Sequence, residues 1–231
     1  MFSIEFNNKN SFKDFGLTII SKNIAPPKKI KIKETVPFMN GTYDFSSIYL
    51  NQLYEERSLT YTFNVIGSNK IDMNSIRSEV EEWLSTPEKT KLKDDVFPGV
   101  YFLAEAEDIK FDEDGRIATM TVEFIAYPFK IGEHLEGSDI WDDFNFTCDY
   151  AQDTKFEVNG LVTIDIVNAS IVTITPTVVC DSDIEVTKDG ITYLFKEGET
   201  TDYRFILNKG KNTFKISGNG YIDFRFRKEI L

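Results

Sequence analysis

The chain has 231 residues, 41% of them hydrophobic and 14% aromatic, which is enough for one large β domain or two smaller ones and excludes a disordered chain. A net charge of −12 opposes sequence-independent binding to nucleic-acid phosphates. No apolar run approaches the roughly 20 residues that cross a bilayer. The first residues also lack the basic and apolar segments of a signal peptide, so we expect a soluble chain made in the cytoplasm, without membrane insertion.

The N-terminal segment is predicted to form short strands. Residues 2–6 alternate apolar and polar side chains and, with residues 17–22, make the first predicted strands. Residues 28–33 intersperse lysine with isoleucine, which we interpret as a strand whose lysines face solvent and protect a sheet edge. An anion-binding patch is the alternative interpretation of this basic run.

A half-buried strand and a helix are predicted next. In residues 58–66, four apolar side chains alternate with polar ones: Leu59, Tyr61, Phe63 and Val65. Residues 72–85 carry one apolar stripe at helical spacing, made by Ile76, Val80, Trp83 and Leu84. We expect Asp72 to be the N-cap, Ile71 and Ile76 to form a hydrophobic staple, and Pro87 to stop the helix.

Residues 100–127 are predicted to form a long β-hairpin. Its first strand has four large apolar residues of one parity: Tyr101, Leu103, Ile109 and Phe111. Its second strand has a row of apolar residues on one face: Ala118, Met120, Val122, Phe124 and Ala126. The sequence Asp112-Glu113-Asp114-Gly115 supplies the turn, because glycine tolerates the positive φ that a tight connection needs.

The composition changes near residue 130, where Gly132–Gly137 makes a polar connection, so we predict two domains, residues 1–131 and 132–231. The second domain shows short strands separated by glycine-containing turns and no helical stripe. Its predicted strands are 161–167, 171–180, 183–187, 191–196, 202–207, 212–217 and 220–227, with turns at Asn159-Gly160, Asp189-Gly190, Lys209-Gly210 and Gly218-Asn219-Gly220. The chain is therefore predicted to be mainly β, with one α-helix and a C-terminal antiparallel β-sandwich.

Few residues suit catalysis, and we predict no catalytic residue, no cofactor and no metal site. His134 is the only histidine and lies in the polar connection, and no Gly-x-Ser-x-Gly motif is present. Paired carboxylates lie in predicted turns or strand ends, at Asp112/Asp114, Asp142/Asp143 and Asp181/Asp183. Cys148 and Cys180 lack metal-site spacing and are expected to be small buried groups, although the spacing leaves a disulfide open.

Carbohydrate binding is the alternative function, because exposed aromatic rings on β-sandwiches stack against sugars. The candidates are Trp141 and Tyr193, together with Tyr150 and Tyr221. Packing in a core or an interface is the competing role for each ring. Under this alternative the chain is a carbohydrate-binding module or a lectin-like receptor adaptor.

The order of several short motifs resembles the distal tail protein (Dit) family of siphophages, in the short form without an inserted carbohydrate-binding module. The N-terminal motifs are Ser11–Leu17, Asn40–Asp44, the helix ending in Trp83-Leu84, and Ala126–Phe129 at the end of the hairpin. The C-terminal half is similar to the family's galectin-like domain at Val158–Gly160, Asp189–Tyr193, Lys209–Phe214 and Asp223–Arg227.

The resemblance implies a structural hub and not an enzyme. Such proteins form a homo-hexameric ring at the virion tail tip, assembled in the host bacterial cytoplasm. The ring joins the tail tube protein to the tail-tip protein that carries the lysin, and in some members to a receptor-binding protein. Their N-terminal belt domains make the ring and its channel, and their C-terminal domains project outward. DNA passes through without specific binding, and a net charge of −12 is compatible with an acidic channel, since like charge prevents phosphates from adhering.

The first strand and the hairpin turn contain the candidate residues for the ring interface or the channel. Strands exposed at sheet edges can pair across subunits, and cyclic symmetry closes such contacts. We therefore expect the N-terminal strands and the hairpin 100–127 to carry much of the ring contact. The candidates are Phe2, Ile4, Phe6, Asp112, Glu113 and Asp114.

Overall fold

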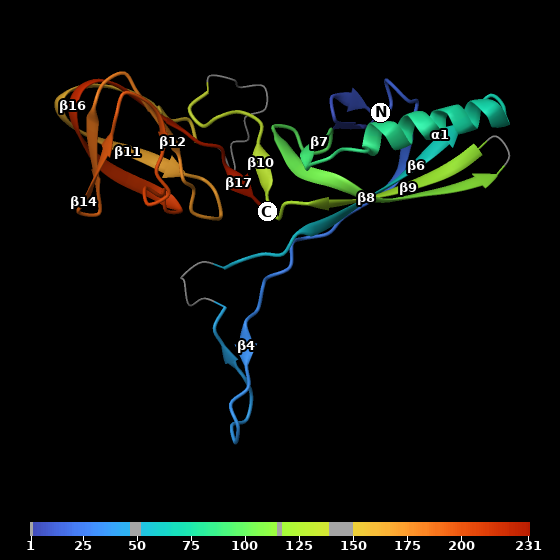
Figure 1. Cartoon of the computed structure of the whole chain (residues 1–231), viewed down its shortest axis with the longest axis horizontal. Coiled ribbons are helices and arrows are strands. Elements are labelled where there is room, and N and C mark those ends of the chain that lie inside the picture. The colour runs from blue at the N-terminus through green and yellow to red at the C-terminus, as the bar shows by residue number, and fades with distance from the viewer. Residues whose placement is uncertain (1, 47–51, 115–116, 139–149) are drawn as a thin grey trace. The chain divides into compact units, whose positions relative to one another are not determined.

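The computed structural model describes residues 2–46, 52–114, 117–138 and 150–231. The chain forms two compact units, residues 1–130 and residues 131–230 (Figure 1). It is mainly β, and the described residues contain one α-helix, as the sequence predicts. Within the described residues, no helix is long and apolar enough to span a membrane.

Unit 1 is built on one antiparallel sheet with the strand order β2-β1-β7-β8-β9-β6-β3. These strands are β1 (Ile4–Phe6), β2 (Lys9–Asn10), β3 (Thr18–Ile24), β6 (Arg57–Ile66), β7 (Thr90–Asp94), β8 (Val100–Asp114) and β9 (Ile117–Ala126). The predicted rows of β6 and β9 are confirmed, because their apolar residues are buried on one face in the core. The opposite residues of the same strands form the outer face of the sheet.

An ion pair between a partly exposed lysine and a buried carboxylate joins distant parts of this sheet. Lys22 of β3 donates from Nζ to both carboxylate oxygens of Asp94 at the end of β7, over 2.9 and 2.8 Å. Tyr61 of β6 donates its hydroxyl to the same carboxylate over 3.0 Å. Burial, and then the charge of Asp94, raise the pKa of Tyr61 far above its ordinary value, so the hydroxyl keeps its proton. Because β3 and β7 are four positions apart in the strand order, these bonds require the sheet to curl.

Helix α1 (Lys70–Leu84) covers the inner face of the sheet (Figure 1). The predicted cap is wrong: Asn69 is the N-cap, and its side chain accepts from the N–H groups of Ile71 and Asp72. Asp72 instead accepts from the N–H of Ser68, and the staple is absent because Ile71 is exposed. At the other end, Trp83 donates its indole N–H to the carbonyl of Phe6 over 2.6 Å, which ties the helix to β1.

The hairpin of β8 and β9 confirms the prediction for residues 100–127, except for the parity of its first strand. A β-bulge lies between Ala106 and Asp108 and shifts the register by one residue. Phe102 and Ala104 therefore face the same core as Ile109 and Phe111, and the predicted row through Tyr101 and Leu103 is wrong. Each half of the strand alternates, but a strict period of two does not run through the bulge.

The predicted strand over residues 28–33 is mostly absent. Beyond β3, the chain leaves the sheet as a narrow two-stranded ribbon, here called the arm and defined by residues 26–46 and 52–56 (Figure 1). Its only named strands are β4 (Lys33–Glu34) and β5 (Tyr43–Asp44), which pair with each other. The lysines do face solvent, but the intervening isoleucines have no core to face, so the alternating pattern has no buried side to stabilise a longer strand.

Unit 2 is an antiparallel sheet with the order β14-β13-β16-β12-β15, in which β11 also pairs with β16. Its strands are β11 (Lys155–Asn168), β12 (Thr177–Cys180), β13 (Ile184–Lys188), β14 (Ile191–Phe195), β15 (Gly198–Thr201), β16 (Gly210–Arg225) and β17 (Glu229–Ile230), with β17 paired to β10 (Lys130–Gly132). One cluster of buried side chains fills its core, with Phe205, Phe214 and Phe224 in mutual ring contact.

Two predicted turns in unit 2 are wrong, because both lie inside long strands. Asn159-Gly160 of β11 pairs directly with Gly218-Asn219 of β16, so the predicted strands 212–217 and 220–227 form one strand over most of their length. Gly218 and Gly220 have φ of 150° and 145°, and β16 changes partner here, from β13 to β12. The glycines thus bend a continuous strand instead of ending it.

The predicted strand over residues 202–207 is also wrong, because the strand in this region is β15 at Gly198–Thr201. Phe205 and Leu207 are nevertheless buried in the core of unit 2, as their hydrophobicity implies. Cys180 is a buried free thiol, and burial, with Asp181 and Asp183, raises its pKa to about 11. Its possible disulfide partner Cys148 lies outside the described residues.

Replacing Asp94 by Asn should destabilise unit 1 strongly, because Lys22 would then keep a charge without its buried partner. We expect a loss of about 2–4 kcal/mol in the free energy of unfolding, since Lys22 is partly exposed and keeps some hydration. Urea denaturation followed by tryptophan fluorescence measures it. Asp165→Asn, which removes a solvent-exposed ion pair with Lys211, is the matched control and should leave the midpoint unchanged.

Replacing Gly220 by Ala should destabilise unit 2 by roughly 2 kcal/mol, because of its positive φ and the crowding around it. A Cβ built at this position lies 2.2 Å from Oδ1 of Asp181. Thermal unfolding of unit 2 measures the effect. Ser217→Ala, three residues earlier on the same strand and exposed, is the control, and equal melting temperatures for the two variants would contradict the strained bend.

Candidate assembly surfaces

The structure separates the three candidate residues of the first strand. Phe2 is exposed, whereas Ile4 and Phe6 are completely buried in the core of unit 1. Phe6 packs edge-on against Trp83 and Phe124, with ring centroids 6.2 and 5.2 Å away. The side chains of Ile4 and Phe6 therefore do not reach the surface and cannot contact a second copy, while Phe2 can.

The acidic turn of the hairpin projects its described carboxylates to opposite sides. Asp112 pairs across to Thr119 on the outer face, and Glu113 lies on the helix side, 3.8 Å from the guanidinium of Arg77. Both residues are exposed. Asp114 ends β8 and pairs with Ile117 at the tip of the hairpin. Consecutive residues of a strand alternate faces, so the carboxylates of Asp112 and Glu113 do not form one cluster.

The outer face of unit 1 is polar in its middle rows across β8, β9, β6 and β3, between Ile125 of β9 at one end and Ile117 at the other. Its rows follow from the register: Asp108, Glu123, Thr60 and Asn23 in one row, then Lys110, Thr121, Thr62 and Ser21, then Asp112, Thr119, Asn64 and Thr18. Lys110 is paired with Asp108 over 2.9 Å, which raises the pKa of the lysine. The carboxylates of Asp112 and Glu123 leave this face negatively charged.

The end of this sheet at the hairpin turn is apolar instead, and we call it the tip, defined by Ile66, Ile71 and Ile117. Ile66 and Ile117 are Cα partners, and their side chains are 67% and 53% exposed. Ile71 follows in the first turn of α1 and is 80% exposed. By the register, Ile66 and Ile117 belong to the outer face, one row beyond Asp112 and Thr119, whereas Ile71 belongs to the helix that covers the inner face.

The arm is held together by backbone bonds between its two strands. Ile30 and Leu53 pair over 2.9 Å, Lys28 and Glu55 over 2.8 Å, and the N–H of Phe45 donates to Ile32 over 2.8 Å. At its base, Arg57 is buried and donates to the carbonyls of Ala25 and Pro128. No described residue of the arm is buried, and six large apolar side chains are exposed on it: Ile32, Val36, Phe38, Tyr43, Phe45 and Leu53.

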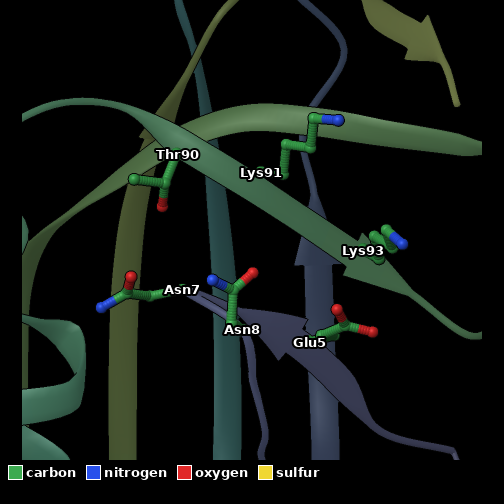
Figure 2. A pocket seen from close by; sticks show the side chains of 6 residues that line it. All are labelled: Glu5, Asn7, Asn8, Thr90, Lys91 and Lys93. Carbon is green, nitrogen blue, oxygen red and sulfur yellow. The ribbon is translucent and has the colours of Figure 1, made fainter.

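A small polar pocket of about 300 Å³ lies on unit 1 between β1 and β7. Figure 2 shows its lining side chains, which are Glu5, Asn7, Asn8, Thr90, Lys91 and Lys93. Asn7 and Asn8 have positive φ, as the two-residue turn between β1 and β2 requires. Glu5 and Lys93 are opposite each other in the sheet, so their charges offset. The pocket holds no histidine, cysteine or hydroxyl–base pair suited to catalysis.

The sugar-stacking candidates are only partly placed. Tyr193 is half-buried, with its ring packed edge-on against Phe205 at 5.1 Å and its hydroxyl donating to the carbonyl of Arg204. Tyr150 and Tyr221 are exposed, and Trp141 lies outside the described residues. The geometry of Tyr193 fits packing in unit 2 better than stacking on a ligand. In the described part of the chain, no three His, Cys, Asp or Glu side chains gather as metal ligands do.

Sequence reasoning missed the arm and the outer face. The local signal for the arm is the Pro37-Phe38 step followed by Asn40-Gly41, a turn signature that places an aromatic residue where no core is near. The outer face has a signal in the alternating Ser, Thr and Asn residues of residues 58–64 and 119–121. That signal predicts a solvent-exposed face on each strand. It does not show that four strands place these faces side by side in one sheet.

Comparison with known proteins identifies the first unit and the overall fold. A family model described as the phage tail protein RIFT-related domain matches residues 4–126, more than half of the chain. The crystal structure of the SPP1 Dit protein, described as a paradigm of the hub adsorption apparatus in phages infecting Gram-positive bacteria, is similar over 100% of both chains, with a TM-score of 0.69 and 14% sequence identity. At this identity the similarity shows a shared fold.

Two structures of the phage p2 baseplate in its activated conformation match more weakly. The one with Sr has a TM-score of 0.44 at 9% identity and covers 100% of this chain and 99% of its own. The one with Ca has a TM-score of 0.46 at 10% identity and covers 98% of this chain and 97% of its own. A search of curated proteins finds no match.

Proposed function

Because the chain belongs to the family of phage tail proteins with a RIFT-related domain, we propose that it is the structural hub of a siphophage tail tip. Six copies form a closed ring that joins the tail tube protein to the tail-tip protein carrying the lysin. The supporting observation is the fold that the chain shares with the SPP1 Dit hub protein along its full length. This hub is assembled in the host cytoplasm and resides at the virion tail tip.

The proposed role is structural and not enzymatic. The similar proteins are tail and hub components, and the pocket of unit 1 presents two amides, two lysines and one glutamate, without a nucleophile–base pair. Unit 1, with its sheet, helix and arm, is the proposed belt domain of the ring. Unit 2 is the proposed galectin-like domain, which projects outward to a receptor-binding protein.

The outer face of unit 1 is the proposed channel wall. A wall that DNA must pass needs polar groups and negative charge, because phosphates adhere to unpaired lysines and arginines. The outer face has threonine, serine and asparagine side chains, and its one described lysine is neutralised by Asp108. Asp112 and Glu123 supply the negative charge. This arrangement suits passage without binding.

The ring predicts a particle of about 160 kDa, six copies of the 26.6 kDa chain. Light scattering coupled to gel filtration measures the mass, and electron microscopy of the same fraction shows the shape. We expect the mass to hold at moderate salt, because large apolar contacts are screened little. A 27 kDa species at every protein concentration would contradict the proposed ring.

The channel wall predicts an effect on DNA release. Reversing two charges on the outer face, Asp108→Lys with Asp112→Lys, should slow DNA ejection several-fold, because the new lysines attract phosphates. Ejection from virions that carry the variant is followed with a DNA-binding dye. The control reverses two exposed carboxylates of unit 2, Glu157→Lys with Glu185→Lys, for the same change in net charge. Equal ejection rates for the two variants would remove the outer face from the channel.

A further inference from the structure

The loop at the end of the arm contains one of the three Asn-Gly pairs of the chain. This loop spans residues 35–42, between β4 and β5, and the other two pairs lie in unit 2. We propose that Asn40-Gly41 is a site of spontaneous covalent modification, at which Asn40 loses its side-chain amide, and that Asn159-Gly160 and Asn219-Gly220 are protected. The inference concerns the chain by itself and does not depend on the proposed ring.

Deamidation joins the backbone nitrogen of one residue to the side chain of the residue before it. Hydroxide removes the proton from the nitrogen of Gly41, and this nitrogen attacks Cγ of Asn40. The bond from Cγ to Nδ2 then breaks, and Nδ2 takes up a proton and leaves as ammonia. Water opens the resulting succinimide ring at either carbonyl, which gives aspartate or isoaspartate. Glycine favours the attack, because it has no side chain to block the approach and its backbone is the least restricted.

The backbone around Asn40 is open to this reaction. Asn40 and Gly41 are both exposed, and neither belongs to a strand. Gly41 has a φ of 90°, and a Cβ built on it has no atom within 4 Å. Within the loop, the N–H of Met39 donates to the carbonyl of Val36 over 3.2 Å. Among the described residues, none accepts from the N–H of Gly41, so no hydrogen bond holds the nitrogen that must attack.

The pair in β11 is held in a ladder. Asn159 and Gly160 pair with Asn219 and Gly218 of β16. The N–H of Gly160 donates to the side-chain oxygen of Asn219 over 3.1 Å, so the nitrogen that would attack is already engaged. Ring closure also needs the asparagine to leave the extended conformation, because the nitrogen of the next residue must reach its Cγ. In a paired strand this rotation breaks ladder bonds, so the reaction requires local unfolding.

The pair in β16 is restrained through both its side chain and its main chain. The side-chain oxygen of Asn219 is the acceptor for Gly160, and its carbonyl accepts from the hydroxyl of Ser182 over 2.6 Å. Gly220 lies against the side chains of Asp181 and Ser182, which come within 2.2 Å of a Cβ built on it. These contacts oppose the rotation that would bring the nitrogen of Gly220 to the side chain of Asn219.

Deamidation at Asn40 changes both the charge and the turn of the arm. The arm has equal numbers of basic and acidic residues, so its formal charges cancel: Lys28, Lys29, Lys31, Lys33, Glu34, Asp44, Glu55 and Glu56. The product adds one carboxylate to this balance. Isoaspartate also lengthens the main chain by one methylene, in a loop that the pair of Glu34 and Tyr43 closes. Both changes lie among exposed residues, so the cores of the two units are unaffected.

Peptide mapping measures all three sites in one experiment. Freshly purified full-length chain is kept warm in mildly alkaline buffer, and samples taken over time are digested in mildly acidic buffer and analysed by mass spectrometry. Replacement of the amide nitrogen by oxygen raises the peptide mass, and chromatography separates the aspartate and isoaspartate products. We expect Asn40 to convert about tenfold faster than Asn159 and Asn219, because only the latter two require local unfolding of a ladder. The rate at Asn40 should rise with pH, since the attacking nitrogen must first lose its proton.

The denatured chain is the control for effects of local sequence. In concentrated guanidinium chloride the ladder is lost, and the three sites should convert at rates within a few-fold of one another, because each is an Asn-Gly pair. Asn40→Gln is the matched variant. Glutamine has to close a larger ring, which forms far more slowly, so this variant should lose the fast conversion and keep the slow ones. Circular dichroism checks that the variant is folded.

The outcomes decide the assignment. Fast conversion at Asn40 in the native chain, with similar rates at all three pairs after denaturation, supports it. Equal native rates at the three pairs would show that the ladder gives no protection, and would overturn it. A preference for Asn40 that persists in denaturant would come from local sequence and not from the fold, and would overturn it as well. The absence of conversion at Asn40 in the native chain overturns it directly.

Discussion

The buried carboxylate of Asp94 is the constraint on which the architecture of unit 1 depends. A carboxylate with no exposed surface persists only when it is paired and hydrogen-bonded. Its partners Lys22 and Tyr61 come from β3 and β6, while Asp94 itself ends β7. Satisfying one side chain thus draws distant strands together and curls the sheet. The curl in turn gives the aromatic residues of the inner face a common core, which α1 covers.

Once α1 covers the inner face of the sheet, only the remaining surfaces of unit 1 are available for contacts with other proteins. Ile4 and Phe6 are buried in the core, so Phe2 is the one candidate side chain of the first strand that stays exposed. What remains is an outer face rich in threonine and carboxylate, an apolar tip and an exposed arm. Polar negative surface suits a wall that DNA passes. The proposed function of the outer face follows from this division.

The fold of unit 2 depends on a bend in its longest strand. Its longest strand, β16, has 16 residues. It pairs with β11 along one edge and with two shorter strands, β13 and β12, along the other. Changing partner along one edge requires a bend, and Gly218 and Gly220 provide it because their φ values exclude most side chains. One strand can then wrap a single core with Phe214 and Phe224 on its inner side.

The sequence by itself determined the features that a short stretch of chain decides. The alternation of Leu59, Tyr61, Phe63 and Val65 has a period of two, so it predicts a strand with one buried face wherever that strand pairs. The stripe of Val80, Trp83 and Leu84 likewise predicts the helix from its 3.6-residue period. The mainly β class, the single described helix, the hairpin and the family resemblance all rest on such local patterns and their order.

Only the tertiary structure decided which partner each local signal meets. Asn69 and not Asp72 is the N-cap of α1, because several neighbouring side chains compete to accept from the first N–H groups of a helix. The bulge after Ala106 reversed the faces of β8, and Gly218-Asn219-Gly220 became a bend because β11 pairs along its whole length. The arm, the tip and the outer face arise the same way. Register and curvature depend on contacts between residues far apart in the chain, and no local period encodes those contacts.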